Sequence, residues 1–285
     1  MGNPILGLVA TAGILALSAC GETSKASKSA GIDPVNVIDA TDLNDIMLTV
    51  ADPNEAVTYF RTSLTKDPDR IEFSRGLAKS LVRAKRATEA APVFEKLIKH
   101  KNSTVQDRID YADALIRTNE WKAAEAQLNS VPPTVETFQR YRLEAMIADS
   151  NKKWKKADSF YEIAAGLTTK PANVLNNWGY SKLTRGDYKA AEKLFIEAIT
   201  YNNRLFTSKN NLVLARAAQK KYGLPVIPMT EEERAQLLYT AGLSAIKQGD
   251  KDIGRGLLED AIDSHPRYFA DAVRSLDALK RNVSG

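Results

Sequence analysis

The sequence has few of the residues that build covalent and catalytic centres, with one cysteine and two histidines in 285 residues. The single cysteine, Cys20, excludes an intramolecular disulfide. His100 and His265 lie far apart along the chain, and no spacing of His, Cys and Asp is typical of a metal site. No His-Glu-x-x-His motif or convincing Ser-His-Asp arrangement occurs. We therefore expect no enzyme, no cofactor, no metal site and no small-molecule substrate.

The chain also lacks a strong excess of either charge. It has 40 Lys and Arg against 35 Asp and Glu, a formal net charge of +5. A nucleic-acid-binding protein needs its cations gathered on one face, beside an aromatic or groove-reading element. The small excess does not indicate such a surface, and we expect no nucleic-acid partner.

The first twenty residues contain no charged side chain and include an apolar run from Ile5 to Leu17. A bilayer-spanning helix needs about 20 apolar residues, so this shorter run is typical of the core of a secretory signal. It ends in Leu17-Ser18-Ala19-Cys20, which resembles a lipobox. The alternative is a plain signal peptide with an unrelated cysteine.

The lipobox resemblance implies cleavage before Cys20 and acylation of that residue. Two or more acyl chains hold a protein stably on a membrane, whereas one chain does not. Gly21 stands where an Asp would favour the inner membrane, so its presence favours the outer membrane. Residues 21–36 are rich in Ser, Lys, Gly and Ala and predict a flexible tether of roughly 20–25 Å.

An alanine recurs after the tether at intervals of 33 or 34 residues. Each copy has a bulky residue four positions later and a mostly small residue twelve positions earlier. The alanines are Ala56, Ala90, Ala124, Ala157 and Ala191, the bulky residues are Phe60, Phe94, Leu128, Tyr161 and Phe195, and the earlier residues are Asn44, Ala78, Ala112, Ala145 and Gly179. This pattern resembles the tetratricopeptide repeat (TPR), a pair of antiparallel helices.

A single helix pair of this kind cannot bury its apolar face, so copies stack. The resemblance implies an all-α solenoid, a right-handed superhelix of antiparallel helix pairs. We place five full repeats over 37–205, at 37–70, 71–104, 105–137, 138–171 and 172–205. We expect the turns inside repeats to include Asn119-Glu120, Lys152-Lys153 and Gly186-Asp187.

The repeat pattern is interrupted after residue 205. A sixth copy begins at Asn210-Asn211-Leu212, but Gly223–Pro228 cannot be helical, so residues 206–229 form a half repeat and an extended connector. Thr230 and Glu233 match a capping box and open a final repeat over 230–285. Residues 269–281 are expected to form a solvent-facing capping helix, because terminal units of a solenoid need a polar outer side.

Two further features have simple structural interpretations. Gly254-Arg255-Gly256 lacks the third glycine of a nucleotide-binding motif and lies on a predicted helix, so its glycines indicate a helix crossing. Trp121 and Trp154 begin predicted second helices, which favours packing over a ligand cage.

The first helix of each TPR pair lines the groove in which a protein partner binds. Candidate partner-binding side chains recur on these helices every three or four residues, as on one helical face. They are Arg75, Lys79, Arg83, Arg142, Met146, Asn173, Asn176, Tyr180, Asn210 and Leu214. The alternative is that they are only solvated. The cations at 71–101 would steer an acidic partner or anionic lipid, or form an ordinary solvated surface.

The segments Gly254–Phe269, Asn176–Tyr180 and Lys209–Leu212 resemble the TadD family, TPR lipoproteins of the tight-adherence (Flp pilus) assembly system. The resemblance implies a pilotin-like scaffold that faces the periplasm from the outer membrane and binds the pilus secretin or other assembly components. It implies no catalytic residue. The alternatives within this class are a type IV pilus pilotin, a β-barrel assembly component and a regulator of cell-wall synthases.

Overall fold

The computed structural model describes residues 43–281. The chain divides into two compact units, Met1–Asp45 and Ile46–Gly285, and almost all described residues belong to the second. The predicted signal peptide at 1–20, the lipidation site Cys20, the tether at 21–36 and the start of the first predicted repeat lie outside the described residues.

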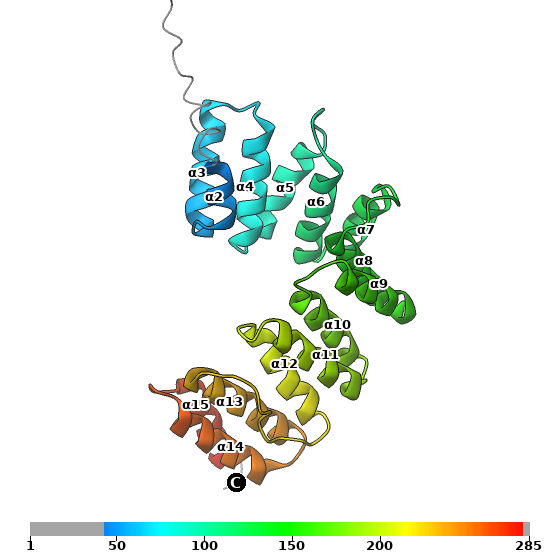
Figure 1. The fold of residues 1–285 in the computed structure, drawn as a ribbon. Coiled ribbons are helices and arrows are strands. Elements are labelled where there is room, and N and C mark those ends of the chain that lie inside the picture. The colour runs from blue at the N-terminus through cyan, green and yellow to red at the C-terminus, as the bar shows by residue number, and fades with distance from the viewer. Residues whose placement is uncertain (1–42, 282–285) are drawn as a thin grey trace, which may run out of the picture. The chain divides into compact units, whose positions relative to one another are not determined.

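All regular structure between residues 43 and 281 is helical, in fourteen helices without a strand (Figure 1). The predicted all-α class is confirmed. In chain order the helices are α2 (Leu43–Thr49), α3 (Pro53–Lys66), α4 (Ile71–Arg83), α5 (Ala87–Leu97), α6 (Val105–Arg117), α7 (Trp121–Asn129), α8 (Phe138–Ser150), α9 (Trp154–Gly166), α10 (Ala172–Thr184), α11 (Tyr188–Tyr201), α12 (Phe206–Ala217), α13 (Glu231–Lys247), α14 (Lys251–Ser264) and α15 (Ala270–Arg281).

From α3 onward, each helix packs against the next one in the chain. A second set of contacts links alternate helices, α4 to α6, α6 to α8, α8 to α10 and α10 to α12. The first four of these helices are the first members of successive helix pairs, α12 is the half repeat that follows them, and we call the five helices the first-helix row. The pairing of each helix with its sequence neighbours is the packing expected of a repeat solenoid.

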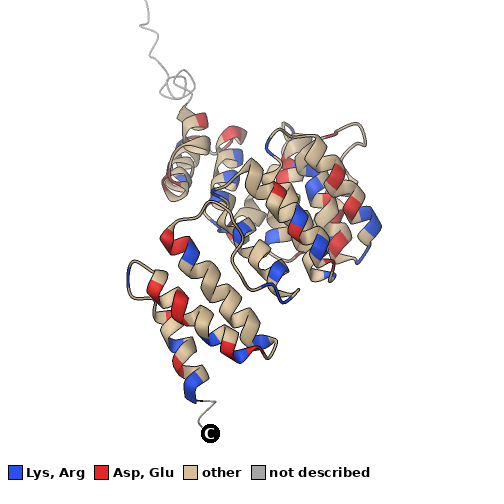
Figure 2. Cartoon of the chain, turned by 60° about the horizontal axis from the view of Figure 1, so that its bottom comes forward, with Lys and Arg blue, Asp and Glu red and all other residues tan. Residues whose placement is uncertain are grey.

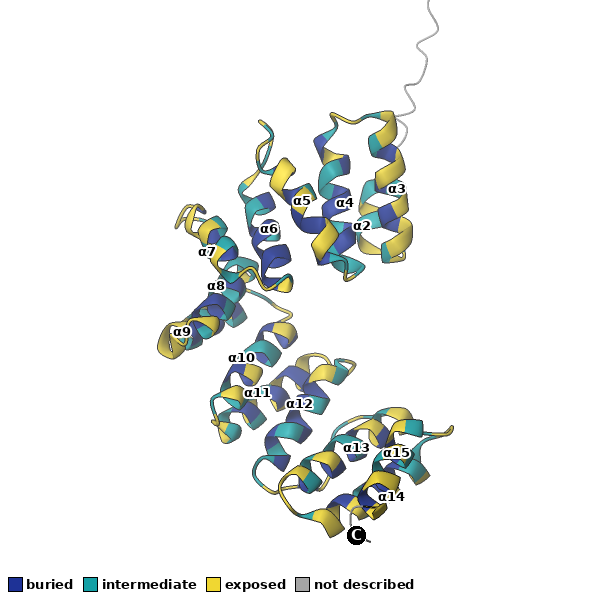
Figure 3. Cartoon of the chain, turned by 180° about the vertical axis from the view of Figure 1, so that it is seen from behind, coloured by how far each residue is buried: buried dark blue, intermediate teal, exposed yellow. Residues whose placement is uncertain are grey.

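The repeated residues of the sequence form the core between the helices. The five alanines and the five bulky residues that follow them are each at most 2% exposed. Figure 3 shows this buried surface on the inner sides of the helices. At Gly179 a Cβ atom would lie 2.6 Å from Cε1 of Phe195, so α10 and α11 approach more closely than a larger side chain allows. The repeat pattern therefore records helix–helix contacts.

Six helices in the described region end in the same hydrogen-bonded turn. In each turn one residue has a positive φ, and the next N–H donates to the carbonyl five residues earlier, as in a Schellman motif. The positive-φ residues are Lys85, Asn119, Lys152, Gly186, Lys220 and Gly249, and the bonds include Lys153 N to Ala148 O and Asp187 N to Lys182 O. The three turns predicted from the sequence are among them.

Two helices between residues 43 and 281 begin with a complete capping box, and one of these is the box predicted at the start of α13. Thr230 accepts the N–H of Glu233, and the Glu233 carboxylate accepts the N–H of Thr230. Thr104 and Asp107 make the same reciprocal pair at the start of α6. These bonds satisfy N–H groups that have no partner inside the helix.

No helix follows α12 until α13 begins at Glu231. The intervening segment is fixed by its side chains: Leu224 and Met229 pack against the cluster that contains Leu237, and the Tyr222 hydroxyl donates to Asp250 at 2.5 Å. Val226 is fully exposed. The segment between the two helices is therefore held against the fold at several points.

The last three helices form a close cluster. A Cβ atom at Gly254 on α14 would lie 2.9 Å from the Gly242 carbonyl on α13, which confirms the predicted crossing at this glycine. Gly256 has nothing within 4 Å of such an atom and takes no part in the crossing. α15 packs on α14 and buries Ala272, Leu276 and Leu279.

Candidate functional site

The first-helix row carries the predicted groove residues, and three of its predicted cations are paired with aspartates of α6. α6 contributes aspartates that face α4 on one side and α8 on the other, so acidic side chains lie between two basic sets. Figure 2 shows basic and acidic residues interspersed along the helices. The pairs are Arg75–Asp107 at 2.6 Å, Lys79–Asp110 at 3.3 Å and Arg142–Asp113 at 3.0 Å.

The Arg75–Asp107 pair is bidentate, with Nε and Nη2 of Arg75 donating at 2.6 and 2.8 Å. The Asp107 side chain is fully buried and also completes the capping box of α6. Burial raises the pKa of Asp107, but the hydrogen bonds from Arg75 and Thr104 outweigh it and leave that pKa below its ordinary value. The hydrogen bond to Asp107 raises the pKa of Arg75. Arg75 is thus a structural cation.

Arg83 is also engaged within the fold. Its Nη1 and Nη2 donate to the carbonyl oxygens of Met47 at 2.8 Å and Ala51 at 2.9 Å, at the end of α2. The Met47 carbonyl belongs to the last turn of α2, where carbonyl groups lack partners inside the helix, and Ala51 follows that helix. All four cations that were predicted to face a partner therefore bind groups of this chain.

The two predicted asparagines on α10 and α12 link neighbouring helices. Oδ1 of Asn176 accepts from Ser208 Oγ at 3.0 Å and from Asn211 Nδ2 at 3.1 Å, which ties α10 to α12. Oδ1 of Asn210 accepts from Thr240 Oγ1 at 2.8 Å, which ties α12 to α13. Of the remaining predicted residues, Asn173 is exposed at the start of α10 and Leu214 is half-buried on α12.

A pocket of about 430 Å³ opens on this face between α8, α10 and α12 and the starts of α7 and α9. It brings together three of the predicted groove residues, Met146, Asn176 and Tyr180. Its walls are rich in aromatic side chains and in neutral hydrogen-bonding groups. The other residues that line it are Trp121, Asp149, Ser150, Trp154, Tyr161, Asn177, Ser181, Thr184, Thr207 and Asn211.

Trp121 and Trp154 begin α7 and α9 as predicted, but both also line this pocket. Trp121 is half-buried and packs on the hydrophobic core. Trp154 is 37% exposed, and the guanidinium of Arg185 lies over its ring at 5.3 Å from the centroid. Packing alone therefore does not describe these tryptophans.

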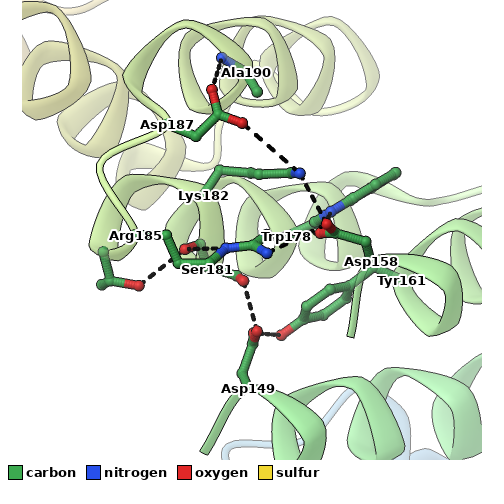
Figure 4. Close-up of polar contacts among 10 residues, drawn as sticks. Asp149, Asp158, Tyr161, Trp178, Ser181, Lys182, Arg185, Asp187 and Ala190 are labelled. Carbon is green, nitrogen blue, oxygen red and sulfur yellow. Dashed lines mark hydrogen bonds and ion pairs between the residues drawn. The ribbon is translucent and has the colours of Figure 1, made fainter. Parts of the chain in front are cut away.

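Asp149 is the carboxylate of the pocket. Figure 4 shows it between Ser181 and Tyr161, whose hydroxyl groups donate to it at 2.7 and 3.0 Å. Within residues 43–281 no Lys, Arg or His side chain forms an ion pair with it. Burial raises the pKa of Asp149 despite both hydrogen bonds. Burial beside this carboxylate also raises the pKa of Tyr161.

A second aspartate near this site, Asp158, has the opposite environment. It accepts from Arg185 at 2.6 Å, Lys182 at 2.9 Å and Trp178 Nε1 at 2.7 Å (Figure 4). Burial raises the pKa of Asp158, but these donors outweigh it and lower that pKa overall. Lys182 on α10 and Arg185, the residue after its last turn, are thus both bound to Asp158.

Comparison with protein families identifies the repeats. Sequence profiles of the tetratricopeptide repeat family match residues 48–103, 81–147 and 236–268. The chain therefore contains tetratricopeptide repeats. Repeats of this type imply a scaffold for protein–protein interaction, and the TPR fold is typical of non-enzymatic proteins. No curated protein sequence matches the chain.

Solved TPR structures share the fold at low identity. The chain of the APC/C hetero-tetramer Cut9–Hcn1 has a TM-score of 0.61 and 12% identity, over 86% of this chain and 51% of that one. A tetratricopeptide repeat protein from Parabacteroides merdae has a TM-score of 0.55 and 12% identity, over 85% and 98%. A monomeric mutant of IFIT1 bound to Gppp-AAAA has a TM-score of 0.61 and 14% identity, over 84% and 63%.

The TPR pattern did not point to Asp149 or Ser181 as site residues. Neither occupies a position that defines the repeat, and carboxylates are common on the outer faces of repeat helices. What marks Asp149 and Ser181 is that they line the same pocket as Trp121 and Trp154. That proximity is known only once the fold is known. Among residues 43–281, no helix is both long and apolar enough to cross a membrane, and no cluster of three potential metal ligands occurs.

Proposed function

We propose that this TPR protein is a lipid-anchored scaffold of the bacterial envelope, which faces the periplasm from the outer membrane and assists Flp pilus assembly by binding the pilus secretin. The anchor is Cys20, the last residue of the lipobox-like Leu17-Ser18-Ala19-Cys20. The binding surface is the first-helix row, where the pocket and the exposed Tyr180 lie. In this proposal the repeats bind the partner, and the signal sequence with Cys20 directs the protein to the outer membrane.

The observation that carries the pilus-assembly role is the resemblance of Gly254–Phe269 to the end of TadD-family proteins. In the structure this segment spans most of α14 and its closing turn, and it includes the glycine that meets α13. The interrupted repeat after α12 is a second shared feature. Repeat-level similarity carries no weight here, because all TPR proteins share it.

The test is affinity purification of the tagged protein from detergent-solubilised envelopes, followed by mass spectrometry. We expect the pilus secretin and other assembly components among the bound proteins, and we expect less secretin in the outer membrane of a deletion strain. Recovery of barrel-assembly or cell-wall proteins without secretin would replace the pilus role with one of the alternatives and leave the TPR scaffold unchanged.

The lipid anchor is tested separately with Cys20→Ala. We expect this variant to leave the outer-membrane fraction, because it has no thiol to acylate. Radiolabelled palmitate should be incorporated into the unaltered chain and not into the variant. An unchanged membrane fraction for Cys20→Ala would refute the anchor.

A further inference from the structure

We propose that the pocket between α8, α10 and α12 receives a lysine or arginine side chain from an extended segment of the protein partner, held between the aromatic rings and the carboxylate of Asp149. This inference rests on the proposed role as a protein-binding scaffold, and it adds the chemistry of the partner. The chain's own groove cations are not available for the opposite arrangement, an acidic partner, because they bind groups of this chain.

The charge of the pocket favours a cationic guest. Within the described part of the chain, residues 43–281, the Asp149 carboxylate accepts hydrogen bonds only from the neutral hydroxyls of Ser181 and Tyr161. Arg142 and Arg185 lie near this pocket, but each forms an ion pair with another aspartate. Arg142 pairs with Asp113 at 3.0 Å, and Arg185 pairs with Asp158 at 2.6 Å. Asp149 is half-buried, and a carboxylate that is partly withdrawn from water without a cation beside it carries a desolvation cost. A guest ammonium or guanidinium group would remove this cost, which an apolar or acidic guest cannot do.

The walls of the pocket favour the same guest. Tryptophan and tyrosine rings attract cations to their faces, and tryptophan does so most strongly. Trp121, Trp154 and Tyr180 all line the pocket, and Trp154 already has the Arg185 guanidinium over its ring. Aromatic faces also accommodate the aliphatic stem of a lysine or arginine. The aromatic rings of the pocket can therefore contact both the aliphatic stem and the charged group of one basic side chain.

The volume and the rim allow the rest of an extended segment to bind. About 430 Å³ lies within the range of ordinary ligand sites. Asn177 and Asn211 line the pocket from α10 and α12. The Asn211 amide nitrogen already donates to Asn176, whereas the half-buried Asn177 carries an amide group that can both donate and accept hydrogen bonds, as an extended backbone requires. The site thus fits a side chain that arrives on a peptide.

The experiment selects random dodecapeptides on phage against the full chain purified in detergent, so that it does not depend on the identity of the partner. We expect Lys or Arg to be enriched at one position. The best peptide is then synthesised, and its binding is measured by fluorescence anisotropy. Replacement of its basic residue by norleucine should weaken binding about tenfold or more, since the ion pair and the cation–π contacts are lost together.

Three variants of the chain complete the test. Asp149→Asn keeps the shape of the side chain and removes its charge, and it should weaken peptide binding about tenfold. Trp154→Leu should weaken it as well, and it serves as the second variant if Asp149→Asn does not fold. Asp252→Asn removes one exposed charge on α14, outside the pocket, and should leave binding unchanged. Circular dichroism verifies the fold of each variant.

Three results would overturn the inference. These are enrichment of acidic or purely apolar peptides, absence of any enriched peptide with a folded chain, and equal binding by the chain and by Asp149→Asn. Recovery of secretin from envelopes together with any of these results would refute the pocket's role and leave the proposed function in place. Selection of basic peptides without recovery of secretin would support the pocket's role and refute the proposed binding of the secretin.

Discussion

The ammonium group of Lys209 on α12 lies 2.7 Å from Oε2 of Glu233 on α13, and the Lys209 side chain is only 3% exposed. The same carboxylate oxygen accepts the backbone N–H of Thr230 at 3.1 Å. One carboxylate therefore starts a helix and neutralises a buried cation on the helix before it. This pair joins α12 to α13 across the segment that has no helix.

Loss of the charge on Glu233 should loosen this junction. Glu233→Gln keeps a capping side chain but leaves Lys209 buried without an anion, which costs about 3 kcal/mol. We expect faster amide hydrogen exchange in α12 and at the start of α13. Lys209→Met combined with Glu233→Gln should recover most of the loss, because no unpaired charge then remains. Equal protection of the single variant and the unaltered chain would show that the ion pair is not needed.

The crossing of α13 and α14 requires glycine at one position of the Gly254-Arg255-Gly256 segment and not at the other. In Gly254→Ala the new Cβ would meet Ile246 Cγ1 at 2.4 Å and the Gly242 carbonyl at 2.9 Å, and we expect a loss of about 1–3 kcal/mol. Gly256→Ala meets nothing within 4 Å and should stabilise the helix by up to about 1 kcal/mol. Thermal unfolding followed by circular dichroism distinguishes the two, and a loss of stability in both would contradict the assignment.

The Schellman turns predict a stabilising substitution at a surface residue. Lys152 has a φ of 55°, and a left-handed conformation costs a non-glycine residue roughly 1–2 kcal/mol. We expect Lys152→Gly to raise the midpoint of thermal unfolding. The matched variant is Gly186→Lys, which places lysine at the equivalent turn with a φ of 82° and should lower the midpoint. Shifts in the same direction would argue against this explanation.

Asp149 predicts an unusual dependence of stability on pH. Burial, and to a lesser extent the charge of Asp158, raise its pKa above 3.8, although Ser181, Tyr161 and Arg185 oppose this. A carboxyl with a raised pKa disfavours the folded state above that pKa and has no such effect below the pKa of the unfolded chain. Asp149→Asn should therefore be more stable than the unaltered chain at pH 7, and the difference should disappear as the pH falls toward 3.8.

Asp107 provides the control of opposite sign. Its pKa lies below the ordinary value, because the donors Arg75 and Thr104 outweigh burial. Its contribution to stability is present above 3.8 and is lost as the pH falls through the lowered pKa. Asp107→Asn should therefore be less stable than the unaltered chain at pH 7, with a difference that shrinks on acidification. Unfolding midpoints from pH 7 down to about pH 2 measure both variants, because the Asp107 effect is lost only below the unfolded pKa. The same sign for both variants at pH 7 would contradict these pKa directions.

Much of the helix pattern could be predicted because its signals are local or periodic. The capping box at Thr230 and Glu233 and the turn at Gly186 depend on residues whose preferences act within a few positions. The crossing at Gly254 is a contact between two helices, and its signal was the small residue itself. The candidate site was predictable only in part. Met146, Asn176 and Tyr180 share one pocket, but the four groove cations bind this chain, and Asp149 was not singled out.

The sequence by itself determined that the chain is an all-helical repeat, because alanines and bulky residues 33 or 34 positions apart record contacts that recur in each helix pair. Only the tertiary structure decided which charged side chains form ion pairs within the chain and which do not. Arg75 and Asp107 are 32 residues apart, and Asp149 and Ser181 are also 32 apart. Such contacts join neighbouring repeats through positions at which the repeat pattern does not fix the residue type. The periodicity of the sequence therefore does not specify them.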